Sequence, residues 1–95
     1  MAFEWDSEKN KSKIDKPGIS FEQAQEIFYD PLHISILDEQ FQYFEERWIT
    51  IGQIQDGDIL VVAHLYIVEK EDEKIRIISA RNATRKERKD YETIE

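Results

Sequence analysis

Two segments rich in β-branched residues, joined by an Asp-Gly pair, constrain the fold of this chain more than any other feature. Residues 47–54 and 59–68 alternate in the manner of β-strands, and Asp56-Gly57 between them suits the positive φ angles of a type I′ turn. We therefore predict a β-hairpin. Because side chains along a strand point alternately to opposite faces, the register of this turn decides which residues face the core.

If Asp56 and Gly57 form the whole turn, Gln55 lies opposite Asp58 and the hairpin divides into two faces. The predicted core face is apolar and comprises Trp48, Ile54, Ile59, Val61, Ala63, Leu65 and Ile67. The predicted binding face is mixed and comprises Glu45, Arg47, Ile49, Ile51, Gln53, Leu60, Val62, His64 and Tyr66. In this register Arg47 lies diagonal to His64, so the two side chains are expected on one surface.

Two further segments extend the hairpin into an antiparallel sheet of about four strands. They are a short strand at residues 34–37 and a longer one at 74–80. The register of the longer strand leaves two possibilities open. One register places Arg76 on the mixed face, and a shift of one residue replaces it with Ser79 and Arg81; we favour Arg81.

Two capping boxes predict where helices begin. Ser20 to Gln23 has the serine and glutamine spacing that satisfies exposed backbone donors, and helical spacing of apolar residues continues to about Tyr29. Thr84 to Glu87 opens a basic terminal helix with so little apolar surface that it needs a partner surface to be stable. A third, polar helix is expected from a cap at Asp6 to Lys16.

Length and composition favour a single domain over residues 1–95, with an α+β fold in which N-terminal helices pack on the sheet. The 95 residues include no cysteine, which excludes disulfides, thiolate metal sites and a cysteine nucleophile. The start has no signal-peptide pattern, and no apolar run approaches the roughly 20 residues of a membrane helix, so we expect a cytoplasmic protein without membrane contact.

The net charge of −8 conceals a strong segregation. Residues 74–91 contain seven basic and two acidic side chains, a local charge of +5, so the remainder carries −13. Since charges farther apart than about 8 to 10 Å are screened by salt, the local excess decides what a surface attracts. A polyanion and a charged protein partner both remain possible.

Several short motifs together resemble the BrnT family of bacterial toxins, small ribonucleases with a RelE-like fold. The matching pieces cover nearly the whole chain: Phe3-Glu4-Trp5-Asp6, Lys16, Gly18 to Glu22, Asp30-Pro31, Glu45 to Ile49, Ile51-Gly52, Leu60 to His64, Ile75 to Arg81, Ala83-Thr84, Glu87-Arg88 and Tyr91. Where members usually carry histidine, this chain has Pro17, and Ser12 stands where asparagine is common. The resemblance implies an endoribonuclease that inhibits translation. It also implies a hetero-oligomer with a dimeric BrnA-type antitoxin, through which the toxin reaches operator DNA.

Cleavage of RNA by 2′-hydroxyl attack requires a proton acceptor, a proton donor and positive charge on the transition state, but no cofactor or metal. We assign the charge to Arg47 and Arg81, because guanidinium forks match phosphate oxygens. His64 is the candidate acid or base, since imidazole titrates near neutrality, and Glu45 would orient Arg47. The alternatives are structural: a salt bridge for either arginine and a hydrogen-bonded packing role for His64.

The remaining candidates contact RNA or a partner. We assign RNA binding to Lys16, Arg76, Ser79 and Arg85, and antitoxin binding on the terminal helix to Arg85, Arg88 and Tyr91. No metal-binding motif is present, and His33 and His64 are too separated in sequence to suggest a zinc site. Two other functions remain open. One is a homologue weakened at Pro17 that acts as an antitoxin-binding module in operon autoregulation, and the other is a partner-binding domain without RNA contact.

Overall fold

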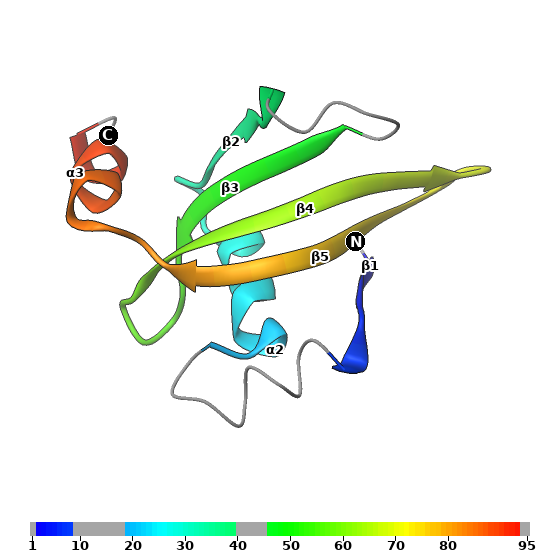
Figure 1. Ribbon diagram of the computed structural model, residues 1–95, viewed down its shortest axis with the longest axis horizontal. Coiled ribbons are helices and arrows are strands. Elements are labelled where there is room, and N and C mark those ends of the chain that lie inside the picture. The colour runs from blue at the N-terminus through cyan, green and yellow to red at the C-terminus, as the bar shows by residue number, and fades with distance from the viewer. Residues whose placement is uncertain (1, 9–18, 40–45, 94–95) are drawn as a thin grey trace.

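The protein forms one five-stranded sheet with short helices on both of its faces (Figure 1). The computed structural model describes residues 2–8, 19–39 and 46–93. The strands lie in the order β1-β5-β4-β3-β2. Their bounds are β1 Ala2–Trp5, β2 Ile34–Leu37, β3 Arg47–Gln53, β4 Ile59–Glu69 and β5 Asp72–Asn82. The helical elements are α2 Phe21–Ala24, the 3-10 helix η1 Gln25–Tyr29 and α3 Arg85–Thr93.

The N-terminal strand β1 makes the sheet mixed, and the predicted architecture of N-terminal helices on an antiparallel sheet of about four strands is therefore wrong. β1 pairs parallel with β5, with Ala2 facing Lys74 and Trp5 facing Ile77. A strand of four residues whose partner lies about seventy residues away leaves no local signal of its pairing. The predicted helix that begins at Asp6 is described only at its first residues, where Asp6 Oδ1 accepts the Glu8 amide at 2.9 Å.

The β3–β4 hairpin is closed by a three-residue loop, one residue longer than predicted. The Ile54 amide donates to the Asp58 carbonyl at 2.9 Å, and the Gly57 amide donates back to the Ile54 carbonyl at 3.0 Å. Gly57 has a φ of 100°, whereas Asp56 has no positive φ, so a type I′ turn, which needs positive φ at both positions, does not form. The predicted register is thus wrong by one residue.

This shift exchanges the two faces of β4. Arg47 faces Leu65 and Trp48 faces His64. Because paired residues share a face, the side of Trp48 collects Leu60, Val62 and His64, and the side of Arg47 collects Val61 and Leu65. Strand β3 therefore has the predicted orientation, and β4 has the opposite one.

The face that carries Leu60 and Val62 is the core face. α2 and η1 pack on it through Phe21, Ala24 and Ile27, all fully buried. The capping box of α2 is confirmed, since the Gln23 amide donates to Ser20 Oγ at 3.1 Å and the Ser20 amide donates to Gln23 Oε1 at 3.2 Å. A Cβ on Gly52 would lie 2.9 Å from Ile27 Cβ, so this glycine allows η1 to approach β3 closely.

The opposite side of the sheet, which we call the open face, carries Arg47, Ile49 and Ile51 of β3 with Ile34 and Ile36 of β2 and Val61, Ala63 and Leu65 of β4. α3 lies at one end of it and buries a single residue, Tyr91, whose hydroxyl donates to Asp30 Oδ2. The second capping box is confirmed by hydrogen bonds in both directions between Thr84 and Glu87, at 2.8 and 3.2 Å. Among the described residues, no helix is long and apolar enough to cross a membrane.

Candidate functional site

A β-bulge in β5 places two arginines of this strand, Arg76 and Arg81, on the open face. Arg81 faces Val61 and Ser79 faces Ala63, but one residue further along β4 the register shifts, and Arg76 then faces Leu65. The extra residue is accommodated between Ala63 and His64 of the partner strand. The two registers considered for this strand are therefore both realised, one on each side of the bulge, and Arg76 and Arg81 share the face of Arg47.

Arg47 and Arg76 flank Leu65 across the middle of the open face. Each faces Leu65 from a neighbouring strand, so their Cα atoms lie roughly 10 Å apart at a strand spacing of about 4.8 Å. Arg81 faces Val61, four residues further along β4 and thus about 13 Å away along the strand. The nearer partner of Arg47 is therefore Arg76, although we favoured Arg81 from the sequence.

Acidic side chains stand beside both central arginines. Arg76 Nη1 lies 2.6 Å from Glu4 Oε2, and Lys74 Nζ lies 3.8 Å from the other oxygen of the same carboxylate. Arg47 Nε lies 3.8 Å from Asp38 Oδ2. The Arg76 side chain is 42% exposed and its Glu4 partner 34%, so solvent screens this ion pair and it contributes little to stability, whereas Arg47 is 27% and Asp38 11% exposed, so their contact is more sheltered. An anion that offers several oxygens can replace these carboxylates.

Glu4 and Asp38 were not among the site residues predicted from the sequence. Glu4 reaches Arg76 only because β1 pairs with β5, in which Glu4 faces Arg76. The alternation of Phe3, Glu4 and Trp5 is a local signal of a strand, whereas the sequence-based prediction for this region is only a helix that begins at Asp6. Asp38 ends β2, and its amide donates to the Arg47 carbonyl at 2.7 Å.

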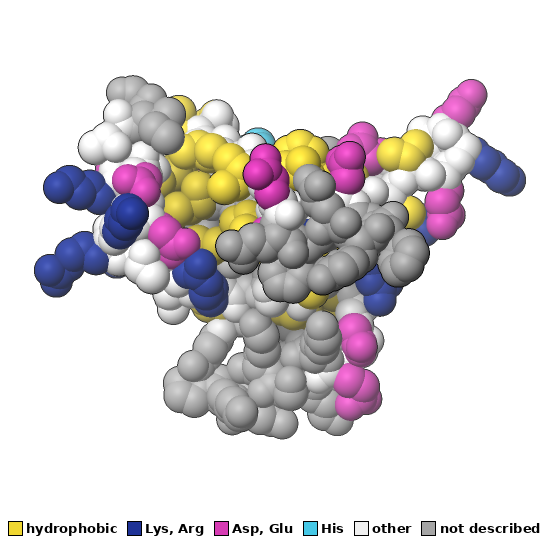
Figure 2. All heavy atoms as spheres, turned by 45° about the horizontal axis from the view of Figure 1, so that its top comes forward, with side chains coloured by type: hydrophobic (Ala, Val, Ile, Leu, Met, Phe, Trp, Pro, Cys, Tyr) yellow, Lys and Arg dark blue, Asp and Glu magenta, His cyan; other side chains and the backbone are white. Residues whose placement is uncertain are grey.

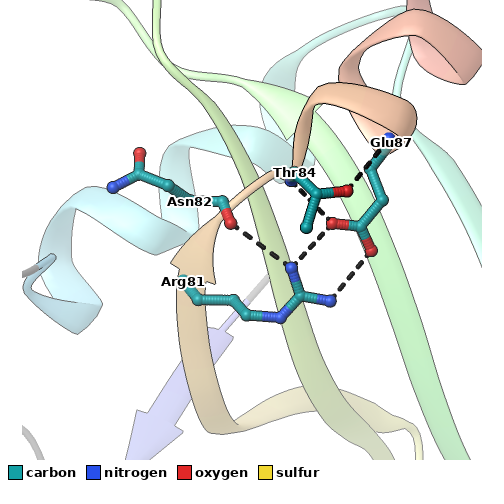
Figure 3. A network of polar contacts seen from close by, with 4 residues as sticks. All are labelled: Arg81, Asn82, Thr84 and Glu87. Carbon is teal, nitrogen blue, oxygen red and sulfur yellow. Dashed lines mark hydrogen bonds and ion pairs between the residues drawn. The ribbon is translucent and has the colours of Figure 1, made fainter.

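Arg81 forms a two-pronged ion pair with Glu87 of α3 (Figure 3). Its Nη1 and Nη2 atoms lie 2.7 and 2.8 Å from the two carboxylate oxygens, and Nη1 also contacts the Asn82 carbonyl at 3.3 Å. The hydrogen bond from Arg81 lowers the pKa of Glu87 to about 2, and the same bond raises the pKa of Arg81. Because Glu87 also caps α3 at Thr84, Arg81 ties the end of β5 to the first turn of this helix.

His64 points away from the arginines, into the core face. It is fully buried, with the rings of Phe28 and Tyr66 centred 4.9 and 5.0 Å from its own. Its Nε2 lies 2.6 Å from Thr50 Oγ1, which in turn lies 2.6 Å from Ser35 Oγ. Burial lowers the pKa of His64 to about 4. The predicted placement of His64 on one surface with Arg47 is wrong, because the hairpin register differs.

The other predicted site residues are placed as follows. Ser79 is half-buried on the open face beside Arg81, and Arg85 and Arg88 are exposed on α3. Tyr91 is only 4% exposed and holds α3 against the chain itself through Asp30. Lys16 and Glu45 lie outside the described residues. Within the described ranges, no cluster of three or more His, Asp or Glu side chains could hold a metal ion.

Comparison with known proteins identifies a family whose model matches most of this chain. Residues 5–87 match the family model described as "Ribonuclease toxin, BrnT, of type II toxin-antitoxin system". A search of curated proteins finds no match. The matched range contains Arg47, Arg76 and Arg81 of the open face and ends in the first turn of α3.

Proposed function

Because the chain belongs to the BrnT family of ribonuclease toxins of type II toxin-antitoxin systems, we propose that it is a metal-independent endoribonuclease that acts through the open face. The observation that carries this proposal is the pair of guanidinium groups, Arg47 and Arg76, on either side of Leu65. Guanidinium groups stay protonated at any working pH and offer planar forks to phosphate oxygens. Two of them on one accessible surface suit the charge that develops when an RNA phosphodiester is attacked.

In the proposed reaction an RNA 2′-hydroxyl attacks the phosphorus of the adjacent 3′ phosphodiester. The bond from this phosphorus to the 5′ oxygen of the next nucleotide breaks. The phosphate takes the place of Glu4 at Arg76, since the two compete for the same fork. The freed Glu4 carboxylate accepts the proton of the 2′-hydroxyl, and the departing 5′ oxygen takes a proton from water. The products are a 2′,3′-cyclic phosphate and a 5′-hydroxyl end.

Two sequence-based assignments, those of His64 and Arg81, take a different form in this proposal. His64 supports the sheet from the core face, because burial keeps it from contact with substrate. Arg81 positions α3 through Glu87 and borders the RNA path together with Ser79 and Arg85. Glu45 and Lys16, which lie outside the described residues, keep their proposed roles as the residue that orients Arg47 and as an RNA contact.

The test is cleavage of RNA by the purified protein in the presence of EDTA. We expect cleavage to persist with EDTA, and Arg47→Ala and Arg76→Ala to lower the rate by about 100-fold or more, the usual effect of removing a transition-state donor. Lys86→Ala, which removes an exposed cation of α3, serves as the matched control and should retain activity. Loss of cleavage with EDTA, or full activity in both arginine variants, would contradict the proposal.

As a type II toxin, the protein has an antitoxin partner, and we propose that this partner is a dimeric BrnA-type protein that binds operator DNA for the complex in the cytoplasm. A catalytically weakened homologue that only binds its antitoxin is the alternative, and Pro17 is the residue that favours it. Growth after expression of the chain without its antitoxin separates the two. Arrest supports the ribonuclease, and normal growth supports the binding module.

A further inference from the structure

We propose that the antitoxin docks on the β2 edge of the sheet as an additional, basic strand that inserts one apolar side chain into a hollow beneath α3. This inference rests on the antitoxin partner of the proposed function, but not on catalysis. Three features of the described residues support it: an outer strand with outward-pointing backbone groups, an adjacent apolar hollow, and acidic side chains around both.

The first feature is the edge of β2. In the strand order of the described residues, β2 is the last strand and pairs only with β3. The Asp38 amide donates to the Arg47 carbonyl, which makes these two residues a hydrogen-bonded pair. Since hydrogen-bonded and non-hydrogen-bonded pairs alternate in an antiparallel ladder, the backbone groups of Ser35 and Leu37 point outward. Such a strand can accept a further strand from another chain.

The second feature is the hollow, which lies between β2 and α3 and has a volume of about 180 Å³. An apolar cavity of about 150 Å³ accommodates a benzene molecule, so this hollow has room for one large apolar side chain. It is lined by Ile34, Ile36, Ile49, Ile51 and Val61 of the sheet and by Glu87, Asp90 and Tyr91 of α3. Figure 2 shows hydrophobic side chains gathered beside the charged side chains of α3. Ile36, at the outer rim, is 58% exposed.

The third feature is the charge around the hollow. α3 turns Glu87, Asp90 and Tyr91 toward the hollow, and because Arg81 binds both oxygens of the Glu87 carboxylate, Asp90 is the acidic side chain that this wall offers to a partner. Glu39, directly beyond the end of β2, adds an exposed carboxylate. A strand that carries lysine or arginine beside its apolar residue therefore complements this site. A second copy of this chain brings the same acidic groups and a net charge of −8, which disfavours self-association.

Docking at this edge also accounts for neutralisation. Asp38, at the end of β2, lies 3.8 Å from Arg47 of the proposed catalytic pair. A partner strand along Ser35 and Leu37 lies two strand spacings, about 10 Å, from β3, and its apolar side chain in the hollow covers part of the open face, where it competes with RNA. The docking surface lies on the side of α3 that carries Glu87 and Asp90, and not on Arg85 and Arg88, which the sequence favoured.

Amide hydrogen exchange of the full chain, alone and in complex with a BrnA-type antitoxin, tests the proposal directly. In the free protein the outward amides of Ser35 and Leu37 should exchange quickly, and in the complex they should become protected by at least about tenfold. Unchanged exchange of both amides in a saturated complex would overturn the proposal, whatever the outcome for RNA cleavage.

Two substitutions separate the backbone and side-chain parts of the interface. Leu37→Pro removes an outward donor without removing a hydrogen bond to β3, and Ile36→Lys places a cation at the rim of the hollow. Each should weaken antitoxin binding by at least about tenfold, as for central interface residues. Val68→Lys is the matched control, since Val68 is an apolar residue of β4 far along the sheet and is 68% exposed, against 58% for Ile36.

The oligomeric state of the chain tests the alternative that a second copy of the chain, and not the antitoxin, occupies the β2 edge. Sedimentation of the chain without antitoxin should show a monomer. A dimer that Ile36→Lys dissociates would assign the β2 edge to a second copy and overturn the proposal. If the unmodified chain fails to cleave RNA but the β2 amides are protected in the complex, the catalytic proposal fails and this one stands.

Discussion

Protonation of the buried His64 should make the stability of this protein fall steeply in mild acid. Its pKa is about 4 in the folded chain because burial disfavours the charged ring, against an ordinary value of 6.5. With the folded pKa depressed, the stability that depends on the neutral ring is present above pH 6.5 and is lost as the pH falls toward 4. Between pH 7 and pH 5 the unfolded chain takes up this proton and the folded chain does not.

The size of the effect follows from this difference in pKa. A difference of one unit corresponds to about 1.4 kcal/mol, so lowering the pH from 7 to 5 should reduce the free energy of unfolding by about 2 kcal/mol through His64 alone. The pH window lies above the range in which Glu87 titrates, since the pKa of Glu87 is about 2 in the folded chain and 4.5 ordinarily. Urea unfolding followed by the fluorescence of Trp5 and Trp48 measures the change.

The decisive comparison is between two histidine variants. His64→Gln removes the titrating ring and keeps a side chain that can hydrogen-bond to Thr50, so the loss of stability between pH 7 and pH 5 should shrink by about 2 kcal/mol. His33→Gln replaces the other histidine, which is exposed, and should leave the loss unchanged. An identical loss in His64→Gln and in the unmodified chain would refute the reasoning.

Three further variants test how the elements are held together. Glu87→Gln should lower the free energy of unfolding by about 1 kcal/mol in thermal melts at neutral pH, because it weakens the α3 cap and its ion pair; an unchanged melting temperature would contradict this. Tyr91→Phe removes the hydroxyl that donates to Asp30 and should cost about 1 kcal/mol, seen as faster amide exchange confined to α3. Gly52→Ala places a Cβ 2.9 Å from Ile27 Cβ and should cost about 2 kcal/mol in urea unfolding, whereas a neutral result would mean that η1 moves freely.

The features that the sequence predicted correctly depend on partners a few residues apart. Both capping boxes join residues three positions apart, at Ser20 and Gln23 and at Thr84 and Glu87, and their hydrogen bonds form in the structure. The hairpin also formed, but its turn was one residue longer than the Asp-Gly pair indicates. Because strands alternate with a period of two, that single residue moved His64 from the open face to the core face.

The parts of the site that could not be predicted depend on distant partners. The pairing of β1 with β5 brings Glu4 to Arg76, and neither segment carries information about the other. The bulge in β5 places Arg76 and Arg81 on one face, although five positions separate them and regular alternation would put them on opposite sides. From Arg47 the sequence predicted that the open face would carry guanidinium groups for phosphate. Which other residues share that face could be known only from the strand register in the structure.

The pairing of β1 with β5 determines when, during synthesis, the proposed site of the toxin can form. Glu4 is synthesised 72 residues before Arg76, and among the described strands β1 pairs only with β5, residues 72–82. Synthesis proceeds at about 5 to 20 residues per second, so β1 waits for several seconds before the sheet can close. A nascent or truncated chain that ends before Arg76 therefore contains Glu4 but lacks the second guanidinium, so the proposed pair of arginines is complete only after β5 has been synthesised.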